Sequence, residues 1–445
     1  MNLSDHLTIK KILKVTIFPI IMMIFTSLYS IVDGLFISNF ANKSSFAAVN
    51  LVMPFIMIIG SIGFMMGAGG TALVSRYLGQ GEKDKANNSF SLIVYATIVM
   101  GIIISLLGFF FIVPIIKSLG SINNETSPEM VSEAITYGRI IICFLVFFML
   151  QHLFQSFFLV AGKPRLGFIV ILIGGITNII LDALFIGVFR WGVVGAAVAT
   201  SIGYIITAII SVLYFVIKRN GVIRLGKATF KMKPILRSAY NGLSEFISNI
   251  SMSVVSVVYN IQLLRLYGEN GVAAYGIIMY VSFVFIAMFI GYSIGVAPYV
   301  GFNYGAENHQ ELKNILKKSL IIIFITGIIM MTISLLTAPA FSSFFSNGNT
   351  DLNELSATAM RICSLCFLFA GFSIFTSSFF TALNNGTISA SISMLRTLVF
   401  QITFVFVIPL IVGSIGIWWA NVGAEAISFI LCLTFLATQR KKYGY

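Results

Sequence analysis

The sequence contains, at residues 46–73, the uncharged stretch FAAVNLVMPFIMIIGSIGFMMGAGGTAL. A helix needs about 20 predominantly apolar residues to cross the hydrocarbon core of a bilayer, and this stretch is long enough to do so. Similar stretches recur along the whole chain. Of its 445 residues, 58% are hydrophobic and only 10% are charged, whereas soluble domains carry about 25% charged residues. The composition therefore predicts an integral membrane protein.

The apolar stretches predict twelve membrane-spanning helices. They are longer than barrel strands and lack alternating hydrophobicity, so the backbone must form its hydrogen bonds within helices. The first stretch follows Lys10, Lys11 and Lys14, but it is too long for a signal peptide and is interpreted as a membrane span. The expected fold class is an all-α integral membrane protein, with spans at 12–37, 46–73, 89–113, 135–161, 167–188, 193–217, 239–262, 272–298, 319–343, 359–382, 388–412 and 415–436.

The two halves of the chain repeat one pattern. Six spans in each repeat give both copies the same orientation, related by a pseudo-two-fold axis along the membrane normal. We expect an N-terminal six-helix lobe at 1–217, a cytoplasmic basic linker at 218–237 and a C-terminal six-helix lobe at 238–445. A shift of 226 residues places Met53 on Met279, Gly69 on Gly295, Gly79 on Gly305 and Asn88 on Asn314.

Lysine and arginine collect in alternate loops, and this bias predicts the orientation of the protein. Most of the 28 basic residues lie near the two termini, in the linker at 218–237 or in loops on the same side. The positive-inside rule makes that side cytoplasmic. Both termini are therefore expected on the cytoplasmic side of the cell membrane. The same bias accounts for the net charge of +13, so no nucleic-acid partner is expected.

Four acidic residues lie within the apolar spans: Asp33, Asp182, Glu245 and Glu425. A carboxylate is costly inside a bilayer and is therefore a candidate for function. Asn178 lies four residues before Asp182, so the two share one face of a helix. Burial disfavours a charged carboxylate, and a second carboxylate nearby disfavours it further. Asp33 and Asp182, both expected in the outer half of the first lobe, could then bind protons near physiological pH.

Other polar and flexible side chains in the spans are candidates for contact with a substrate. Glu245, together with Gln151 and Gln155 on the fourth span, is expected to line a cavity, with helix–helix hydrogen bonding as the alternative role. Methionine is adaptable and suits a site that accepts several ligand shapes, and Met53 and Met279 are candidates. For Glu425, a structural role and a role in ion or substrate binding remain open.

Motifs for catalysis or metal binding are missing from the sequence. Cys363-x-x-Cys366 falls in an apolar span and lacks the polar loop of a zinc or redox site. His6, His152 and His309 are far apart in the chain. There is no glycine-rich phosphate loop. We therefore expect no catalytic residue, no metal site and no cofactor.

These features together resemble the multidrug and toxic compound extrusion (MATE) family, and within it the MepA-like branch, over essentially the whole chain. The resemblance rests on Val32-Asp33, on Gly79-Gln80-Gly81, on Asn178-x-x-x-Asp182 and on Gly242-Leu243-Ser244-Glu245-Phe246. Many relatives have a proline shortly after the seventh-span glycine, where this chain has Ser244.

The resemblance also implies roles for individual residues. In the family, a hydrogen-bonded network in the first lobe takes up and releases the coupling cation. The matching positions here are Asp33, Asn178, Asp182, Tyr137 and Thr200. Family members bend the first helix at a proline, for which Pro19 is the candidate hinge, since a proline removes a backbone hydrogen bond.

The expected function is a cation-coupled antiporter that exports lipophilic, often cationic, drugs by alternating access. The expected coupling ion is a proton, with sodium as the alternative. Membrane lipids are further partners, and the protein is expected to act as a monomer. The alternative function is a lipid-linked precursor flippase, which would need several cationic residues in its cavity, and only Arg396 lies well inside a span. A membrane-embedded enzyme or an ion channel fits the sequence less well.

Overall fold

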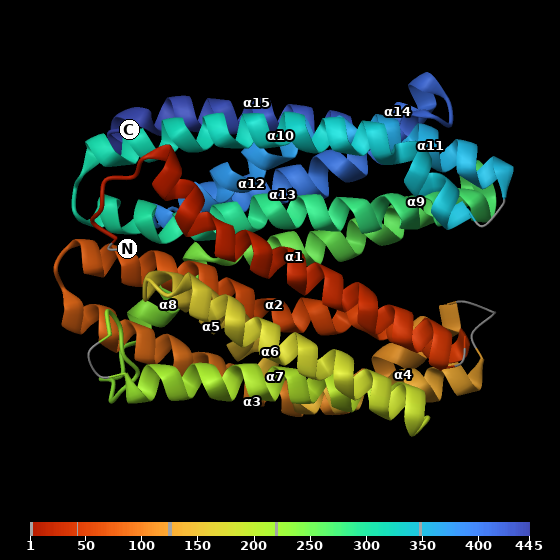
Figure 1. Cartoon of the computed structure of the whole chain (residues 1–445), viewed down its shortest axis with the longest axis horizontal. Coiled ribbons are helices and arrows are strands. Elements are labelled where there is room, and N and C mark those ends of the chain that lie inside the picture. The colour runs from red at the N-terminus through yellow and green to blue at the C-terminus, as the bar shows by residue number, and fades with distance from the viewer. Residues whose placement is uncertain (1–2, 42, 123–126, 219–220, 347–348) are drawn as a thin grey trace. The chain divides into compact units, whose positions relative to one another are not determined.

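The computed structural model describes residues 3–41, 43–122, 127–218, 221–346 and 349–445, and helices are the only regular elements in these ranges. The helices, labelled in Figure 1, are α1 (Ile9–Phe40), α2 (Lys43–Gly79), α3 (Lys83–Ile122), α4 (Pro128–Cys143), α5 (Leu145–Val160), α6 (Pro164–Asp182), the π-helix η1 (Ala183–Val188), α7 (Gly192–Ile217), α8 (Met232–Asn241), α9 (Leu243–Gly305), α10 (His309–Ser346), α11 (Thr350–Ser364), α12 (Phe367–Ala382), α13 (Gly386–Met394), the π-helix η2 (Leu395–Phe400), α14 (Gln401–Val412) and α15 (Gly416–Tyr443).

The described helices account for twelve membrane spans. Nine continuous helical segments are long and apolar enough to cross a bilayer. Two further spans are bent pairs, α4 with α5 at 54° and α11 with α12 at 49°. The 63-residue α9 supplies two spans rather than one, because its backbone leaves the helical region at Gly268, with φ 63° and ψ −150°. The predicted fold class is therefore confirmed.

The positions of the helix ends repeat along the chain. Helix α2 ends at Gly79 and α9 ends at Gly305, 226 residues later. The two bent pairs begin at Pro128 and Thr350, and both change direction between their first and second helices. The internal repeat inferred from a few identities is thus present in the helical architecture, and it includes one bent helix pair in each half of the chain.

The described chain forms two compact units whose boundaries differ from those predicted for the lobes. One unit comprises Leu3 and Phe25–Gly242, and the other comprises Ser4–Ile24 and Leu243–Tyr445. The first part of α1 therefore packs within the second unit. The linker predicted at 218–237 belongs to the first unit as far as it is described, since residues 219–220 lie outside the described ranges.

The end of the predicted linker is a separate helix, α8, which packs against α2. At this contact the two backbones touch through glycines. A methyl group added to Gly69 of α2 would overlap the carbonyl oxygen of Ser238, and one added to Gly242 would overlap that of Met65. Close backbone packing, rather than side-chain burial alone, thus holds α8 in place.

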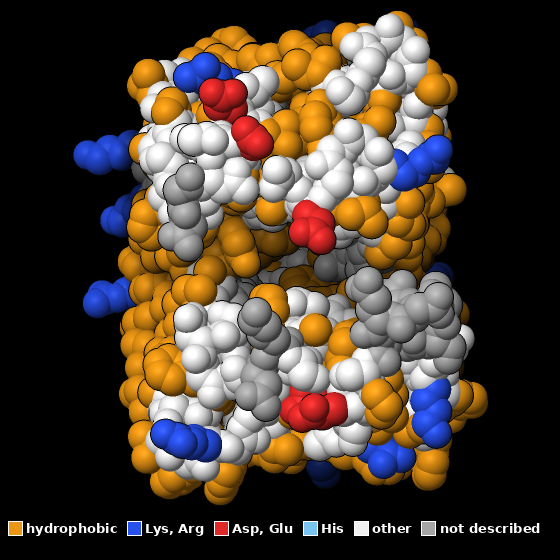
Figure 2. All heavy atoms as spheres, turned by 90° about the vertical axis from the view of Figure 1, so that its right-hand side faces the viewer, with side chains coloured by type: hydrophobic (Ala, Val, Ile, Leu, Met, Phe, Trp, Pro, Cys, Tyr) orange, Lys and Arg blue, Asp and Glu red, His pale blue; other side chains and the backbone are white. Residues whose placement is uncertain are grey.

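Apolar side chains are exposed over much of the surface, as the orange spheres in Figure 2 show. On α3, Ile103, Leu106 and Phe110 are at least half exposed, and their spacing of three and four residues places them on one face. Lipid is the solvent that such a surface requires, so the chain is a multi-pass membrane protein.

Replacing Gly69 by alanine is expected to destabilise the protein, because the new methyl group meets backbone atoms of α8 that cannot rotate away. We expect a loss of about 1–3 kcal/mol in unfolding free energy, measured by thermal unfolding in detergent. Gly276→Ala is the matched control, since no atom lies within 4 Å of the place that its methyl group would take. Equal melting temperatures for Gly69→Ala and Gly276→Ala would contradict this account of the packing.

Candidate functional site

A buried polar cluster in the first unit brings together the five residues predicted for cation coupling. Asp33 comes from α1, Tyr137 from α4, Asn178 and Asp182 from α6, and Thr200 from α7. All five side chains are buried. The amide nitrogen of Asn178 donates a hydrogen bond of 3.3 Å to the hydroxyl of Thr200. Four helices thus converge on a single polar site.

The two carboxyl groups of the cluster are neighbours. Asp33 and Asp182 are close enough to interact electrostatically, and Tyr137 interacts with both. Among the residues that the structure describes, no well-formed hydrogen bond reaches Asp33 Oδ1, either carboxylate oxygen of Asp182, Asn178 Oδ1 or the Tyr137 hydroxyl. Buried polar atoms are normally paired. Two neighbouring buried carboxyl groups are suited to holding a proton or a small cation.

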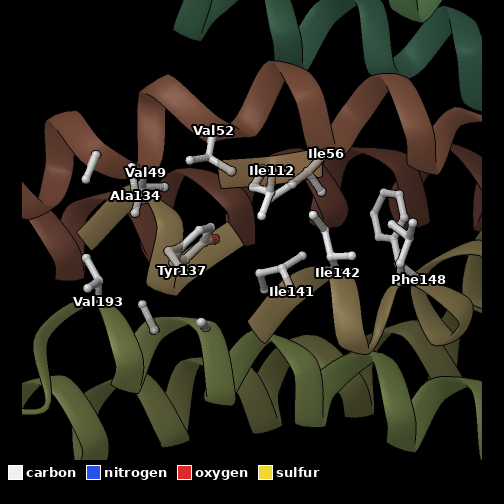
Figure 3. Packing of buried hydrophobic residues seen from close by; sticks show 14 of the residues in the cluster. Val49, Val52, Ile56, Ile112, Ala134, Tyr137, Ile141, Ile142, Phe148 and Val193 are labelled. Atoms are coloured by element: carbon white, nitrogen blue, oxygen red, sulfur yellow. The ribbon is translucent and has the colours of Figure 1, made fainter. Parts of the chain in front are cut away.

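The surroundings of the cluster are strongly apolar. Figure 3 shows Tyr137 among Val49, Val52, Ala134 and Ile141, which belong to one buried hydrophobic group. Water is therefore excluded from this side of the cluster. Electrostatic interactions between the carboxyl groups are stronger in such a medium than in water.

Two tyrosines belong to the cluster and were not predicted from the sequence. Tyr29 interacts electrostatically with Asp33 and forms a side-chain hydrogen bond with Gln151. Tyr204 interacts with Tyr29, Tyr137 and Asp33. Tyr29 lies four residues before Asp33, and Tyr204 four after Thr200, so the helical spacing that linked Asn178 to Asp182 could have identified both.

A small cavity adjoins the cluster. Its volume is about 10 Å³, close to the space that a single water molecule occupies. Tyr29, Gln151, Asn178, Thr200 and Tyr204 contribute to its wall. Gln151, predicted to contact substrate, thus lies beside the carboxyl cluster.

The second unit contains a larger cavity of about 190 Å³. Glu245 and Met279, both predicted to contact substrate, lie in its wall. Two aromatic rings of the wall, Tyr259 and Tyr275, are stacked with centroids 5.1 Å apart. The cavity therefore combines an acidic group with aromatic and flexible apolar surfaces.

An ion pair also lies in the wall of this cavity. The guanidinium of Arg396 donates Nε–H to both carboxylate oxygens of Glu425 at 2.9 Å, and its Nη2 lies 2.7 Å from one of them. The side chains are 14% and 4% exposed. Glu425 is thus neutralised by a partner within the protein, an arrangement that favours the structural role left open by the sequence.

The remaining predicted residues lie elsewhere. Gln155 and Met53 are in the first unit with Gln151, whereas Glu245 and Met279 are in the second. Gln155 is buried next to His152, with which it shares a side-chain hydrogen bond. The candidate hinge, Pro19, lies within the continuous helix α1, where it packs against Gly291 and Gly295 of α9. The five predicted substrate residues are therefore divided between two units.

Comparison with known proteins gives one family match. The family model MatE matches residues 19–184 and 246–407, one segment in each half of the chain. Among curated proteins, the chain is 25% identical over 419 residues to the multidrug export protein MepA of Staphylococcus haemolyticus, covering 93% of this chain and 90% of that protein. It is 24% identical to MepA of Staphylococcus aureus, covering 96% and 93%.

Solved structures show the same fold. A crystal structure of a MATE protein in complex with MaL6 aligns with a TM-score of 0.92 at 23% identity, covering 99% of this chain and 98% of the other. A transporter of the MOP superfamily from Pyrococcus furiosus, described as having a binding pocket of reverse polarity, aligns with a TM-score of 0.91 at 23% identity and the same coverage.

Breaking the Arg396–Glu425 pair is expected to destabilise the protein by about 3 kcal/mol, because one buried charge loses its partner. Glu425→Gln should therefore unfold at a lower temperature than the parent in a thermal melt. The double variant Arg396→Met with Glu425→Met removes both charges and should recover most of the loss. A melt of Glu425→Gln that overlays the parent would show that the pair has no structural role.

Proposed function

The chain belongs to the MatE family, whose members are transporters rather than enzymes, and from this premise we propose that it exports lipophilic, often cationic, compounds in exchange for protons. The observation that carries the proposal is the pair of buried, neighbouring carboxyl groups at Asp33 and Asp182. The relatives described as multidrug export proteins support the substrate class.

The carboxyl cluster supports proton coupling. Two adjacent carboxylates in an apolar site repel each other, so one of them is stabilised by taking up a proton. Asp33 and Asp182 can share that proton without any other ion. Sodium is the alternative, since carboxylate and hydroxyl oxygens are also suitable ligands for a small, hard cation. Imposed gradients of each ion distinguish the two.

The cavity of the second unit supports a cationic substrate. In the described part of the chain, no ion pair involves Glu245, while the charge of Glu425 is balanced by Arg396. The Glu245 carboxylate therefore attracts cations. The rings of Tyr259 and Tyr275 favour cations through cation–π contacts. A drug bound here would be held by charge and by apolar contact rather than by a fixed set of hydrogen bonds.

The same charge balance argues against the flippase alternative. A pyrophosphate headgroup would need several free cationic groups. In this cavity Arg396 is already bound to a carboxylate, and Glu245 adds negative charge. The described residues of the cavity thus favour positive ligands over anionic ones.

Helix α1 covalently connects the carboxyl cluster to residues of the second unit. Its residues up to Ile24 pack in the second unit, and its continuation carries Tyr29 and Asp33 into the first. We assign Pro19 as the point where this helix bends, because the ring leaves one backbone carbonyl without its helical partner. Protonation of Asp33 would then change the shape of α1 during alternating access. The termini are assigned to the cytoplasm, and a monomer is sufficient for this mechanism.

Asp33→Asn and Asp182→Asn are each expected to reduce efflux of ethidium from proton-energised vesicles to background, because each removes a titratable group at nearly constant volume. Asp351→Asn, at an exposed position of α11, is the control and should retain parental efflux. The same vesicles with an imposed sodium gradient should show no efflux. Efflux driven by sodium alone would refute proton coupling, and full efflux in either cluster variant would remove that residue from the mechanism.

Glu245→Gln is expected to weaken binding of a lipophilic cation roughly tenfold, since a hydrogen bond to a charged group contributes about 1.5 kcal/mol. Binding of a neutral compound of similar size should change little. Fluorescence titration of the purified protein measures both. Glu269→Gln, at an exposed position of α9, serves as the control. Equal losses for cation and neutral compound would mean that Glu245 supports the fold and does not select charge.

A further inference from the structure

A large basic groove lies in the first unit and shares no wall residue with either cavity described above. Its volume is about 1060 Å³. Most of its wall comes from the beginning of α3, from residues 224–231 before α8 and from α8 itself, and Tyr77 of α2 and Val216 of α7 complete it. In Figure 1 the connecting segment lies beside the left-hand ends of α3 and α7. We call this surface the basic groove; its cationic wall residues are Lys85, Arg224, Lys227, Lys231, Lys233 and Arg237.

The connecting segment is fixed by side chains of α3. The Asn88 amide pairs with both backbone groups of Thr229, accepting from its N–H at 2.7 Å and donating to its carbonyl at 3.3 Å. Asn87 accepts the N–H of Arg224 at 2.9 Å. Ser91 and Tyr95 bind the N–H and carbonyl of Gly226. The backbone that carries several of the basic side chains is therefore fixed against α3.

The charge of the groove is largely uncompensated. Lys85 pairs with Glu82. For Arg224, Lys227, Lys231, Lys233 and Arg237, no ion pair with a described carboxylate is present. Asp84 is the acidic residue in the wall. Such an excess of positive charge in a concave surface attracts an anionic group.

An exposed apolar surface leads directly into the groove. On α7, Ile209, Leu213 and Val216 are 47%, 50% and 49% exposed, and their spacing places them along one face of the helix. Val216 is itself part of the groove wall. Phe230, next to Lys231, is 71% exposed. A ligand in the groove would therefore have a hydrocarbon-facing surface on one side and cationic groups on the other.

We propose that the basic groove binds the headgroup of an anionic phospholipid, with its acyl chains along the exposed face of α7. The charge of the groove selects an anionic headgroup over a zwitterionic one, because clustered lysine and arginine next to a membrane span attract acidic lipids. The adjoining apolar face selects an amphiphile over a free phosphate. The lipid thereby links the segment before α8 to the membrane surface.

Binding of phosphatidylglycerol and phosphatidylcholine to the full chain in detergent, measured by native mass spectrometry, tests the proposal. The parent should bind phosphatidylglycerol at least tenfold more tightly than phosphatidylcholine. The variant Lys227→Gln with Lys231→Gln and Lys233→Gln should lose about tenfold or more of the affinity for phosphatidylglycerol, with phosphatidylcholine binding unchanged. Lys313→Gln with Lys317→Gln, both exposed on α10, should behave like the parent.

Competition by glycerol 3-phosphate separates a lipid from a small phosphate. It should displace phosphatidylglycerol only in large excess, because it lacks the acyl chains. Displacement at concentrations similar to that of the lipid would overturn the proposal in favour of a soluble phosphate ligand. Equal binding of the two lipids by the parent, or equal losses in the groove variant and in the α10 control, would overturn it as well. Unchanged thermal unfolding of the triple variant confirms that it is folded.

Discussion

The absence of water in the hydrocarbon core is the constraint on which this structure depends. Every backbone group in the core must find a partner within the protein, so regular helices dominate and departures from them occur only inside the bundle. Two of the departures here lie next to polar side chains. The π-helix η1 begins directly after Asp182, and η2 contains Arg396. π-Helical turns are frequent at functional sites, and these two mark the carboxyl cluster and the ion pair.

The two units use one architecture for different chemistry. Their helices begin and end at corresponding positions, and both contain a bent span. In the first unit two carboxyl groups lie close together without a cationic partner among the described residues. In the second, Arg396 balances Glu425 and leaves Glu245 in the cavity wall. This contrast supports a division of tasks in which one unit binds the coupling ion and the other binds the substrate.

The sequence is informative about the fold because the length of an apolar stretch is enough to identify a membrane span. Helical spacing also linked Asn178 to Asp182, and would have linked Tyr29 to Asp33. The pairing of Arg396 with Glu425 was beyond such reasoning, because the residues lie on different helices and no local pattern joins them. The contact of Gln151 with Tyr29 was out of reach for the same reason: the spacing of Gln151 from Gln155 shows a shared helix face, but not which residues that face meets.

The central claim is that the pair Asp33 and Asp182 releases a proton when the protein binds its substrate. Proton release from the purified protein in weakly buffered detergent solution, recorded with a pH-sensitive dye on addition of tetraphenylphosphonium, tests it most directly. The account predicts release by the parent protein and none by the double variant Asp33→Asn with Asp182→Asn, although that variant still binds the cation. Undiminished release by the double variant would contradict the claim.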